Sequence, residues 1–311
     1  MIGPVGDDVS VSLKQADRLV RAFRPDLRAL RVWSVAGAVS AEVTGIEVQR
    51  RDHRCKLVLR QYGTEMLEAV PSIADTEFRL LKLLSGAGLP VPRPCLADES
   101  GTIVQGPCVL MEFIDGDRVH QPADLPSFIR QLGAALAAVH GSGITRADVP
   151  FLRDAASEVP AEFEAGAETL DGIVPETDSR NALQACWPPP QVTVPVVLHG
   201  DYWPGNVLWR DGRLVGIIDW EEAAFGDPMA DLANIRLEIV WHFGPAAMET
   251  LTSEYLALRP AAETATLPLW DLRAALRACR FPLETLPLPA EEIAVMRAAH
   301  REFAVTAMRQ L

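Results

Sequence analysis

The chain has 311 residues, of which 49% are hydrophobic and 23% charged, and its formal net charge is −13 at pH 7. This length predicts one large or two modest globular cores. The acidic balance disfavours nucleic acid and anionic membranes as partners, and no apolar run reaches the roughly 20 residues that span a bilayer. Because Met1–Asp8 contains no basic region followed by an apolar run, we expect a cytoplasmic protein. Nothing in the sequence leads us to expect an obligate protein partner.

Charge is distributed unevenly along the chain. Residues 1–113 are balanced, whereas residues 114–311 hold 15 basic and 28 acidic side chains and so account for the whole net charge. Five cysteines are scattered and never form a CxxC pair, which argues against a disulfide framework and a zinc site. We interpret them as small buried hydrophobic residues.

The first part of the chain predicts one helix followed by an antiparallel sheet. Ser12 with Gln15 has the form of a capping box, and apolar residues then recur at helical spacing, so a helix is expected over 12–24. Three apolar runs predict a three-stranded meander: 30–35, 41–48 and 57–62. A helix over 72–86, capped by Ser72, and a strand over 107–114 follow.

The second part of the chain predicts mostly helices. A helix is expected over 124–140, with His140 as a C-terminal cap. Residues 146–190 are acidic and show no clear pattern. Four further helices are predicted after the last polar motif: 230–243, 246–258, 267–280 and 289–310.

The densest group of polar residues lies between these parts, in residues 195–231. A short apolar strand runs into a polar loop, His199–Asn206, and two apolar runs joined across Asp211 and Gly212 then predict a hairpin. The hairpin should return Asp219 beside Asn206, which lies five residues after Asp201. Two carboxylates and an amide oxygen would then converge, as phosphoryl transfer requires. One carboxylate would orient the attacking hydroxyl, and the other carboxylate and the amide oxygen would bind Mg²⁺.

Three other polar residues of this stretch are interpreted as scaffold. His199 is expected to pack and to hydrogen-bond within the polar loop. Asp227, before Pro228, predicts a helix start, and Asp231 is expected to bind backbone N–H groups of the polar loop.

Four motifs in this order resemble those of the aminoglycoside phosphotransferase and choline kinase-like family of small-molecule kinases: His199–Asn206, Ile218–Glu221, Gly226–Pro228 and Asp231–Ala233. The resemblance implies an α+β, two-lobed protein-kinase-like fold, with a small antiparallel-sheet N-lobe and a mainly helical C-lobe. Residues 1–113 would bind the nucleotide and residues 114–311 would carry catalysis and the acceptor, with residues 146–190 as the substrate-specificity element. The implied enzyme is a Mg²⁺-dependent phosphotransferase that moves the γ-phosphoryl of ATP or GTP to a hydroxyl of a small molecule. Asp201 would be catalytic, and Asn206 and Asp219 would bind the metal.

The same resemblance implies a nucleotide site. Ser40 lies in the first turn of the meander, which covers the phosphates in a kinase, and Arg60 takes the position of the phosphate-binding lysine, with Lys56 as the competing candidate. Glu77 is the carboxylate expected to pair with Arg60. The adenine would lie over Val58 and bind the backbone of the strand that joins the lobes, at Met111, Glu112 and Phe113.

Other functions remain open. A nucleotide-binding pseudokinase is disfavoured by the intact Asp201, Asn206 and Asp219, a protein kinase by the lack of an activation segment, and a metal-dependent hydrolase would leave Arg60 unexplained. Because residues 114–311 are acidic and contain no lysine, they predict an amine-bearing acceptor such as an aminoglycoside. A macrolide, a sugar or an amino-acid alcohol are the alternatives.

Overall fold

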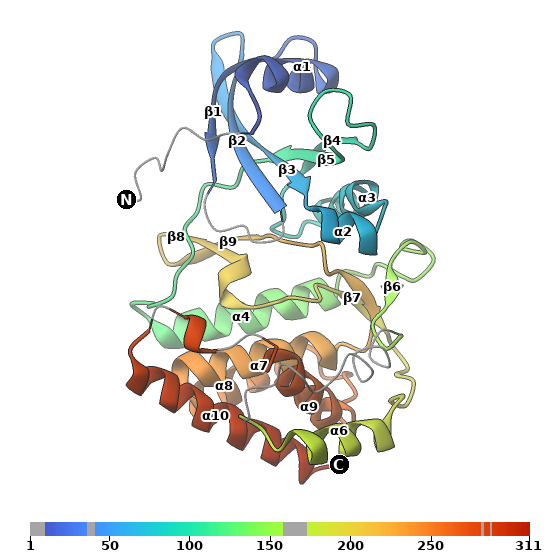
Figure 1. The fold of residues 1–311 in the computed structure, drawn as a ribbon, viewed down its shortest axis with the longest axis vertical. Coiled ribbons are helices and arrows are strands. Elements are labelled where there is room, and N and C mark those ends of the chain that lie inside the picture. Colours follow the sequence, from blue (N-terminus) through green and yellow to red (C-terminus); the bar gives the residue numbers. More distant parts are fainter. Residues whose placement is uncertain (1–9, 36–40, 158–172, 281–282, 287) are drawn as a thin grey trace. The chain divides into compact units, whose positions relative to one another are not determined.

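The computed structural model describes residues 10–35, 41–157, 173–280, 283–286 and 288–311 (Figure 1). The chain divides into two compact units: Met1–Gly116 with Gly216–Glu221, and Asp117–Val215 with Glu222–Leu311. The functional division after residue 113 stays a prediction. Within the described residues, every helix is too short or too polar to cross a membrane.

A five-stranded antiparallel sheet forms the centre of the first unit, in the order β1-β2-β3-β5-β4. Its strands are β1 (Arg28–Ser34), β2 (Ala41–Arg50), β3 (His53–Tyr62), β4 (Pro94–Asp98) and β5 (Cys108–Glu112). Strand β2 pairs with both β1 and β3, with Val43 opposite Arg60 and Gly45 opposite Val58. The predicted meander is therefore confirmed.

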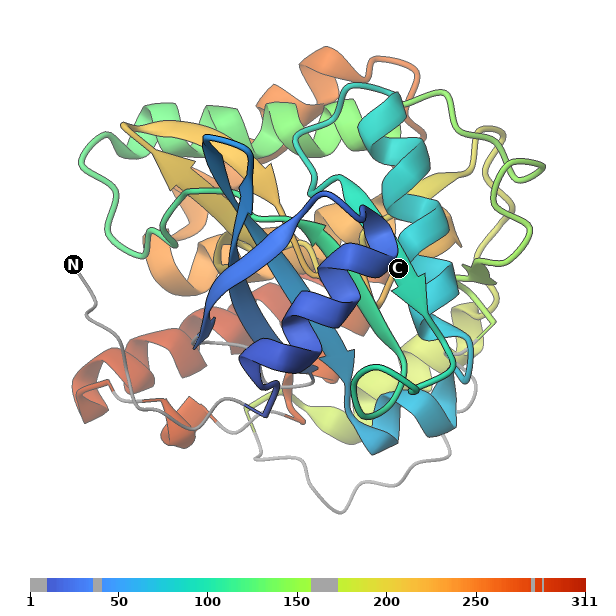
Figure 2. The same ribbon diagram turned by 90° about the horizontal axis from the view of Figure 1, so that it is seen from above.

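Helix α1 (Leu13–Phe23) lies over one face of this sheet (Figure 2). It begins with the predicted capping box, in which the Gln15 backbone N–H donates to Ser12 Oγ at 3.3 Å and the Ser12 N–H donates to Gln15 Oε1 at 3.0 Å. Leu19 of the helix belongs to the same buried core as Leu57 and Leu59 of β3. Since side chains alternate along a strand, Val58 and Arg60 lie on the opposite face.

Helix α3 (Ile73–Gly86) packs against β4 and β5 and carries Glu77. Ser72 stands at its N-cap, but its side chain accepts no capping hydrogen bond, so the predicted cap is only positional. A short helix, α2 (Thr64–Ala69), precedes it and was not expected from the sequence. At six residues, α2 is too short to show a helical repeat of apolar residues.

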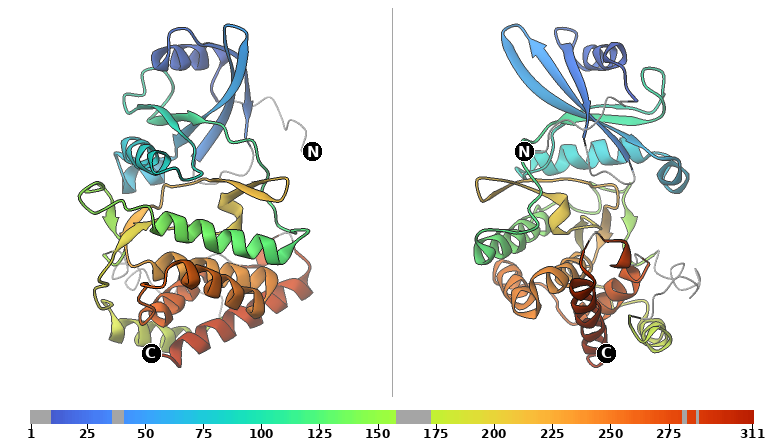
Figure 3. Two further views of the ribbon diagram at one scale, coloured as in Figure 1. Left: turned by 180° about the vertical axis from the view of Figure 1, so that it is seen from behind. Right: turned by 60° about the vertical axis from the view of Figure 1, so that its left-hand side comes forward.

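The second unit is mainly helical. Among the described residues its α-helices are α4 (Leu125–His140), α6 (Glu176–Cys186), α7 (Met229–Phe243), α8 (Pro245–Leu258), α9 (Leu267–Ala278) and α10 (Ala290–Met308). Helices α4 and α8 pack together, as do α7 with α8, α9 and α10 (Figure 3). The four helices predicted near the C-terminus are confirmed.

Short strands lie on both sides of the polar loop in the sequence. A three-stranded sheet has the order β6 (Arg153–Asp154), β10 (Ala224–Gly226) and β7 (Val196–Leu198). Strand β7 is fully buried, as its apolar sequence predicts, and it leads directly into the polar loop. A second pair, β8 (Val207–Arg210) and β9 (Arg213–Ile217), forms the predicted hairpin.

The cysteine prediction was partly wrong. All five are free thiols, and Cys108 and Cys279 are buried as expected, but Cys55 and Cys186 are exposed. Cys55 lies near the tip of the β2–β3 hairpin, where residues 53–56 are all exposed. The burial of Cys55 depends on its position along the strand, which cannot be inferred from the residue type alone.

Candidate active site

The turn between β8 and β9 has the backbone that its sequence predicts. Asp211 has a φ of 52° and Gly212 a φ of 71°. Two successive positive φ angles match the two-residue turns that suit the twist of a hairpin, and aspartate followed by glycine tolerates them best. The local sequence therefore fixes the hairpin between the polar loop and Asp219.

The polar loop, His199–Asn206, is held by a buried carboxylate on α7. The side chain of Asp231 is fully buried, and it accepts the His199 backbone N–H at 2.7 Å on Oδ2 and the Gly200 N–H at 2.8 Å on Oδ1. His140 Nε2 lies 3.1 Å from Oδ2. The prediction that Asp231 binds backbone N–H groups of the loop is confirmed.

Replacing Asp231 by asparagine should lower the free energy of unfolding by about 3–5 kcal/mol, because a buried acceptor of three hydrogen bonds loses its charge and one oxygen. Urea unfolding would measure the change. Asp211→Asn makes the same substitution at the exposed turn and should cost almost nothing. An equal, small effect at both positions would contradict the anchoring role.

This carboxylate also sets a pH dependence. Burial opposes its ionisation, but the hydrogen bonds from the His140 side chain and the His199 backbone, with electrostatic interactions at the same two residues, outweigh burial and hold the pKa of Asp231 below its usual 3.8. Because the pKa of Asp231 is lower in the folded than in the unfolded chain, the ionised carboxylate stabilises the fold at a pH above its unfolded-state pKa. This contribution is lost as the pH falls through the folded-state pKa. Asp231→Asn should therefore show a shallower loss of stability below pH 4.

Gly200 allows the loop to pass close to residue 222. Its φ is +81°, and a Cβ at this position would lie 1.9 Å from the carbonyl oxygen of Glu222. Asn234 Nδ2 and Arg277 Nη1 both donate to the Gly200 carbonyl, at 3.3 and 3.0 Å. Only glycine fits here. The Gly200 N–H and carbonyl groups are both hydrogen-bonded, so the loop backbone next to Asp201 is held in place.

Asp201 and Asn206 are brought together by a hydrogen-bonded turn. The amide nitrogen of Asn206 donates to the Asp201 carbonyl at 2.9 Å and to Asp201 Oδ2 at 3.0 Å. This orientation uses the nitrogen of the amide and leaves its oxygen as the atom that can bind a cation. Asp201 Oδ1 lies 3.7 Å from Arg277 Nη2, and 42% of the Asp201 side chain is exposed.

The histidines near this loop are structural. His199 is fully buried, and its Nδ1 accepts the Asp201 backbone N–H at 3.3 Å, which agrees with its predicted role. His140 was wrongly predicted to cap α4. Its ring is instead buried between Asp231 and Tyr255, with Nδ1 2.7 Å from the tyrosine hydroxyl. The sequence could not show that α7 and α8 lie on either side of this ring.

A second constellation lies within the first unit, around Arg60. Its Nη2 is 2.5 Å from Asp219 Oδ1 and also binds Glu221 Oε2, while its Nη1 lies 3.7 Å from Glu77 Oε1. The Arg60 side chain is only 10% exposed. Burial opposes its charge, but the three carboxylates outweigh burial and raise the pKa of the guanidinium well above its usual value.

The structure thus places the predicted partners Arg60 and Glu77 together. Glu77 is 2% exposed and accepts the hydroxyl of Tyr62 as a second partner. Lys56, the competing candidate, is half exposed and pairs with Asp115 instead. Arg60 is therefore the basic residue of this constellation.

Asp219 has an unusual backbone. Its φ is +72°, one of three positive values among described residues other than glycine. Such a conformation is costly for a residue with a Cβ and is often found where a side chain must be aimed. The predicted convergence of Asp219 with Asp201 and Asn206 stays a prediction.

The remaining predicted nucleotide residues lie on the first unit's sheet. Val58 of β3 is paired with Met111 of β5, and the Phe113 backbone N–H donates to the Lys56 carbonyl at 3.2 Å. Glu112, at the end of β5, is exposed. Ser40 lies outside the described residues. The roles of these residues in nucleotide binding stay predictions.

Several polar contacts of the site were missed in the sequence. Glu221 lies two residues after Asp219 in the motif Ile218–Glu221. This short distance along the chain was the signal that both carboxylates could contact Arg60. Tyr62 had a weaker signal, since period-two alternation puts it on the same face as Arg60. Arg277 and Asn234 had none, because they reach the polar loop from helices far along the chain.

Comparison with known proteins agrees with this geometry. The sequence profile of the phosphotransferase enzyme family matches residues 40–267, nearly three quarters of the chain. The chain belongs to this family. Both constellations, except Arg277, lie inside the matched range.

The chain is also similar to individual proteins with different names. Homoserine kinase of Rhodospirillum rubrum is 31% identical over 215 residues, which cover 64% of this chain and 65% of that protein. Acyl-CoA dehydrogenase family member 11 of Rattus norvegicus is 24% identical over 184 residues, 54% of this chain but 23% of that protein. The chain therefore spans under two thirds of the length of each of these relatives.

The fold is also found in solved structures. Amicoumacin kinase hAmiN, in complex with AMP-PNP, Ca²⁺ and Ami, superposes with a TM-score of 0.64 and 16% identity over 93% of each chain. At this identity the likeness shows the fold alone. The predicted α+β, two-lobed kinase-like fold is confirmed.

Proposed function

We propose that this phosphotransferase moves the γ-phosphoryl of ATP or GTP to a hydroxyl of a small molecule. The hydrogen bond from Asn206 Nδ2 to Asp201 Oδ2 carries the proposal. It orients one carboxylate that can accept the proton of an attacking hydroxyl, beside an amide oxygen that can bind a cation. The partly exposed Asp201 side chain is accessible to an acceptor.

The donor atoms fit Mg²⁺. This ion prefers hard oxygen ligands and is commonly held in nucleotide enzymes by one or two carboxylates together with phosphate oxygens. Asp219 Oδ and Asn206 Oδ1 would hold it, and the bound ion would neutralise charge on the phosphates being transferred. Among the described residues, no group of three or more His, Cys, Asp or Glu side chains forms a separate metal site.

Arg60 would bind the nucleotide phosphates, with Glu77 as its positioning residue. The guanidinium is an appropriate group because its planar fork can bind a phosphate while it keeps a carboxylate partner. Ser40 would contact the phosphates from the first turn. Val58 and the backbone at residues 111–113, Met111, Glu112 and Phe113, would hold the adenine.

Glu77→Gln should lower kcat/KM for the nucleotide about tenfold or more, because Arg60 loses the buried carboxylate that fixes its side chain. Steady-state kinetics with varied ATP would measure this change. Glu68→Gln, on the exposed surface of α2, is the matched control and should behave like wild type. If both variants keep wild-type kinetics, Glu77 does not position Arg60.

The acceptor class has two lines of support. The acidity of residues 114–311 favours an amine-bearing molecule such as an aminoglycoside, and the homoserine kinase relatives favour an amino-acid alcohol. A macrolide or a sugar would also supply a hydroxyl. The proposal is tested by a screen that measures ATP consumption with amines, amino-acid alcohols, macrolides and sugars as acceptors. The Asp201→Asn variant serves as the negative control. ATP consumption that no compound stimulates, or that Asp201→Asn retains, would count against it.

A further inference from the structure

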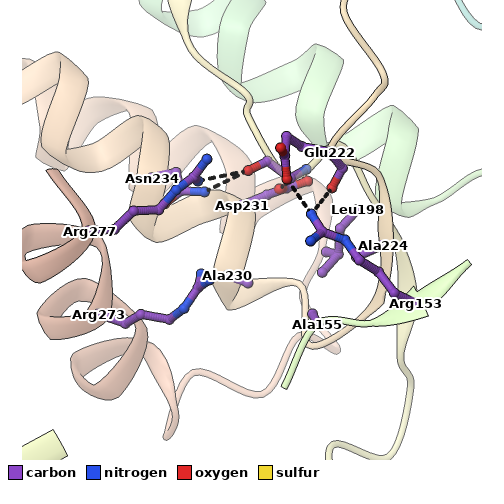
Figure 4. Close-up of a pocket in the computed structure, with 11 residues that line it drawn as sticks. Arg153, Ala155, Leu198, Glu222, Ala224, Ala230, Asp231, Asn234, Arg273 and Arg277 are labelled. Atoms are coloured by element: carbon purple, nitrogen blue, oxygen red, sulfur yellow. Dashed lines mark hydrogen bonds and ion pairs between the residues drawn. The ribbon is translucent and has the colours of Figure 1, made fainter. Parts of the chain in front are cut away.

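A cavity of about 60 Å³ lies within the second unit, next to the polar loop (Figure 4). The charged groups beside it are paired with one another. Arg153 Nη2 is 2.5 Å from Glu222 Oε2, and Arg277 Nη2 lies 3.7 Å from Asp201 Oδ1. The charges around Arg60 in the first unit are not balanced in this way, because one guanidinium meets three carboxylates there.

Arg60 is held at one end of its guanidinium. Within the described residues, both of its hydrogen bonds leave from Nη2, one to Asp219 Oδ1 at 2.5 Å and one to Glu221 Oε2. Its Nε is buried without an acceptor in the same part of the chain, and its Nη1 lies 3.7 Å from Glu77 Oε1, beyond hydrogen-bond distance. Glu77 instead accepts the hydroxyl of Tyr62. The hydrogen bonds that fix the guanidinium therefore go to Asp219 and Glu221.

These two carboxylates differ in exposure and in the role that we assign to them. The Asp219 side chain is 28% exposed and that of Glu221 is 9% exposed. Asp219 is the carboxylate assigned to Mg²⁺, and a carboxylate that binds a divalent cation becomes a poor partner for a guanidinium, because the two positive charges repel each other. One N–H group of Arg60 Nη2 would then be available to a phosphate oxygen, while Glu221 would keep the other.

We propose that Glu221 is a second positioning residue for Arg60, and that it holds the guanidinium once Asp219 binds the metal. The inference rests on the proposed function, in which Arg60 binds the nucleotide phosphates. It also accounts for an arginine at this position. Nη2 carries two N–H groups in fixed directions, so one nitrogen can bind Glu221 and a phosphate oxygen together, whereas the donors of a lysine ammonium rotate.

The test measures the affinity of the full chain for AMP-PNP by calorimetry, with and without Mg²⁺. Glu221→Gln should weaken binding about tenfold in Mg²⁺ but less than about threefold without it, because Asp219 still holds Arg60 when no metal is present. Loss of a negative charge near the phosphates would by itself strengthen binding, so the sign of the change separates positioning from general charge. Unchanged or tighter binding in Mg²⁺ would overturn the proposal, and so would an equal loss with and without the metal.

A double-mutant cycle with Arg60 locates the effect. In Arg60→Gln, which removes the guanidinium, Glu221→Gln should cost no further affinity. A Mg²⁺-dependent loss that persists in Arg60→Gln would mean that Glu221 binds the metal itself, and the proposal would be wrong. Glu221→Asp keeps the charge and should recover part of the wild-type affinity. Glu47→Gln breaks a surface pair with Arg54 on the same sheet, where the two side chains are 3.3 Å apart, and as the matched control it should bind like wild type.

Thermal unfolding of each variant identifies chains that do not fold. If Arg60→Gln does not fold, Arg60→Lys takes its place in the cycle, because lysine keeps the positive charge among the carboxylates. The loss caused by Glu221→Gln should then be smaller in Arg60→Lys than in wild type. An equal loss in both would refute the positioning role.

The outcomes separate this inference from the proposed function. If the wild-type chain binds AMP-PNP with Mg²⁺ and phosphorylates an acceptor from ATP, while Glu221→Gln binds the nucleotide as tightly as wild type, the inference alone fails. If the wild-type chain binds no nucleotide, the proposed function fails and the inference fails with it.

Discussion

Replacing Asp201 by asparagine is expected to lower the turnover number at least ~100-fold, because assistance by a general base typically contributes that much. Nucleotide affinity should stay close to wild type, since we assign the metal to Asn206 and Asp219. The substitution keeps the size of the side chain. Its Oδ1 can still accept the hydrogen bond that Asn206 Nδ2 donates to Asp201 in the wild type.

Single-turnover rates with saturating nucleotide would isolate the chemical step, and titration with a non-hydrolysable nucleotide would measure affinity separately. Asp211→Asn, in the hairpin turn, is the control for the same chemical change. Near-wild-type turnover in Asp201→Asn would mean that the polar loop has been assigned the wrong role. A parallel loss of affinity would indicate that Asp201 binds the metal.

Asp219→Ala is expected to abolish Mg²⁺-dependent nucleotide binding together with activity. A hard divalent ion would lose its only carboxylate ligand in our assignment, and the nucleotide phosphates would face Glu221 and Glu77 without screening. The variant also frees Arg60 from one of its partners. Any affinity that remains should therefore depend on Arg60 and not on magnesium.

Calorimetry with and without Mg²⁺ measures the two contributions. In wild type the metal should strengthen nucleotide binding, and in Asp219→Ala it should make no difference. Asp52→Ala, at the exposed tip of the β2–β3 hairpin, controls for the loss of one negative charge in the same unit. Unchanged Mg²⁺-dependent affinity in Asp219→Ala would refute the ligand role.

Features with local causes could be predicted from the sequence. The turn at Asp211 and Gly212 follows from the φ angles these residues tolerate, and the capping box at Ser12 from side-chain reach over three residues. Asp231 was predicted to anchor the polar loop because it belongs to the same group of motifs, although the N–H groups it binds are 31 and 32 positions away. Arg60 and Glu77 were paired through the family resemblance, and the structure sets them 3.7 Å apart.

Features that depend on distant segments could not be predicted. Arg153 and Glu222 are 69 positions apart, and Arg277 is 77 positions from Gly200. Nothing local to these residues indicates that they meet. The sequence therefore could not show that Arg153, Arg273 and Arg277 line one cavity next to Gly200.

The transfer of phosphate itself tests the central claim most directly. Phosphorus NMR of the chain with ATP, Mg²⁺ and the best acceptor from the screen would follow the γ-phosphoryl group. We predict that its signal is replaced by that of a phosphate monoester of the acceptor, and that Asp201→Asn slows this at least ~100-fold. Release of the γ-phosphoryl group as inorganic phosphate only, with no monoester from any acceptor, would contradict the assignment.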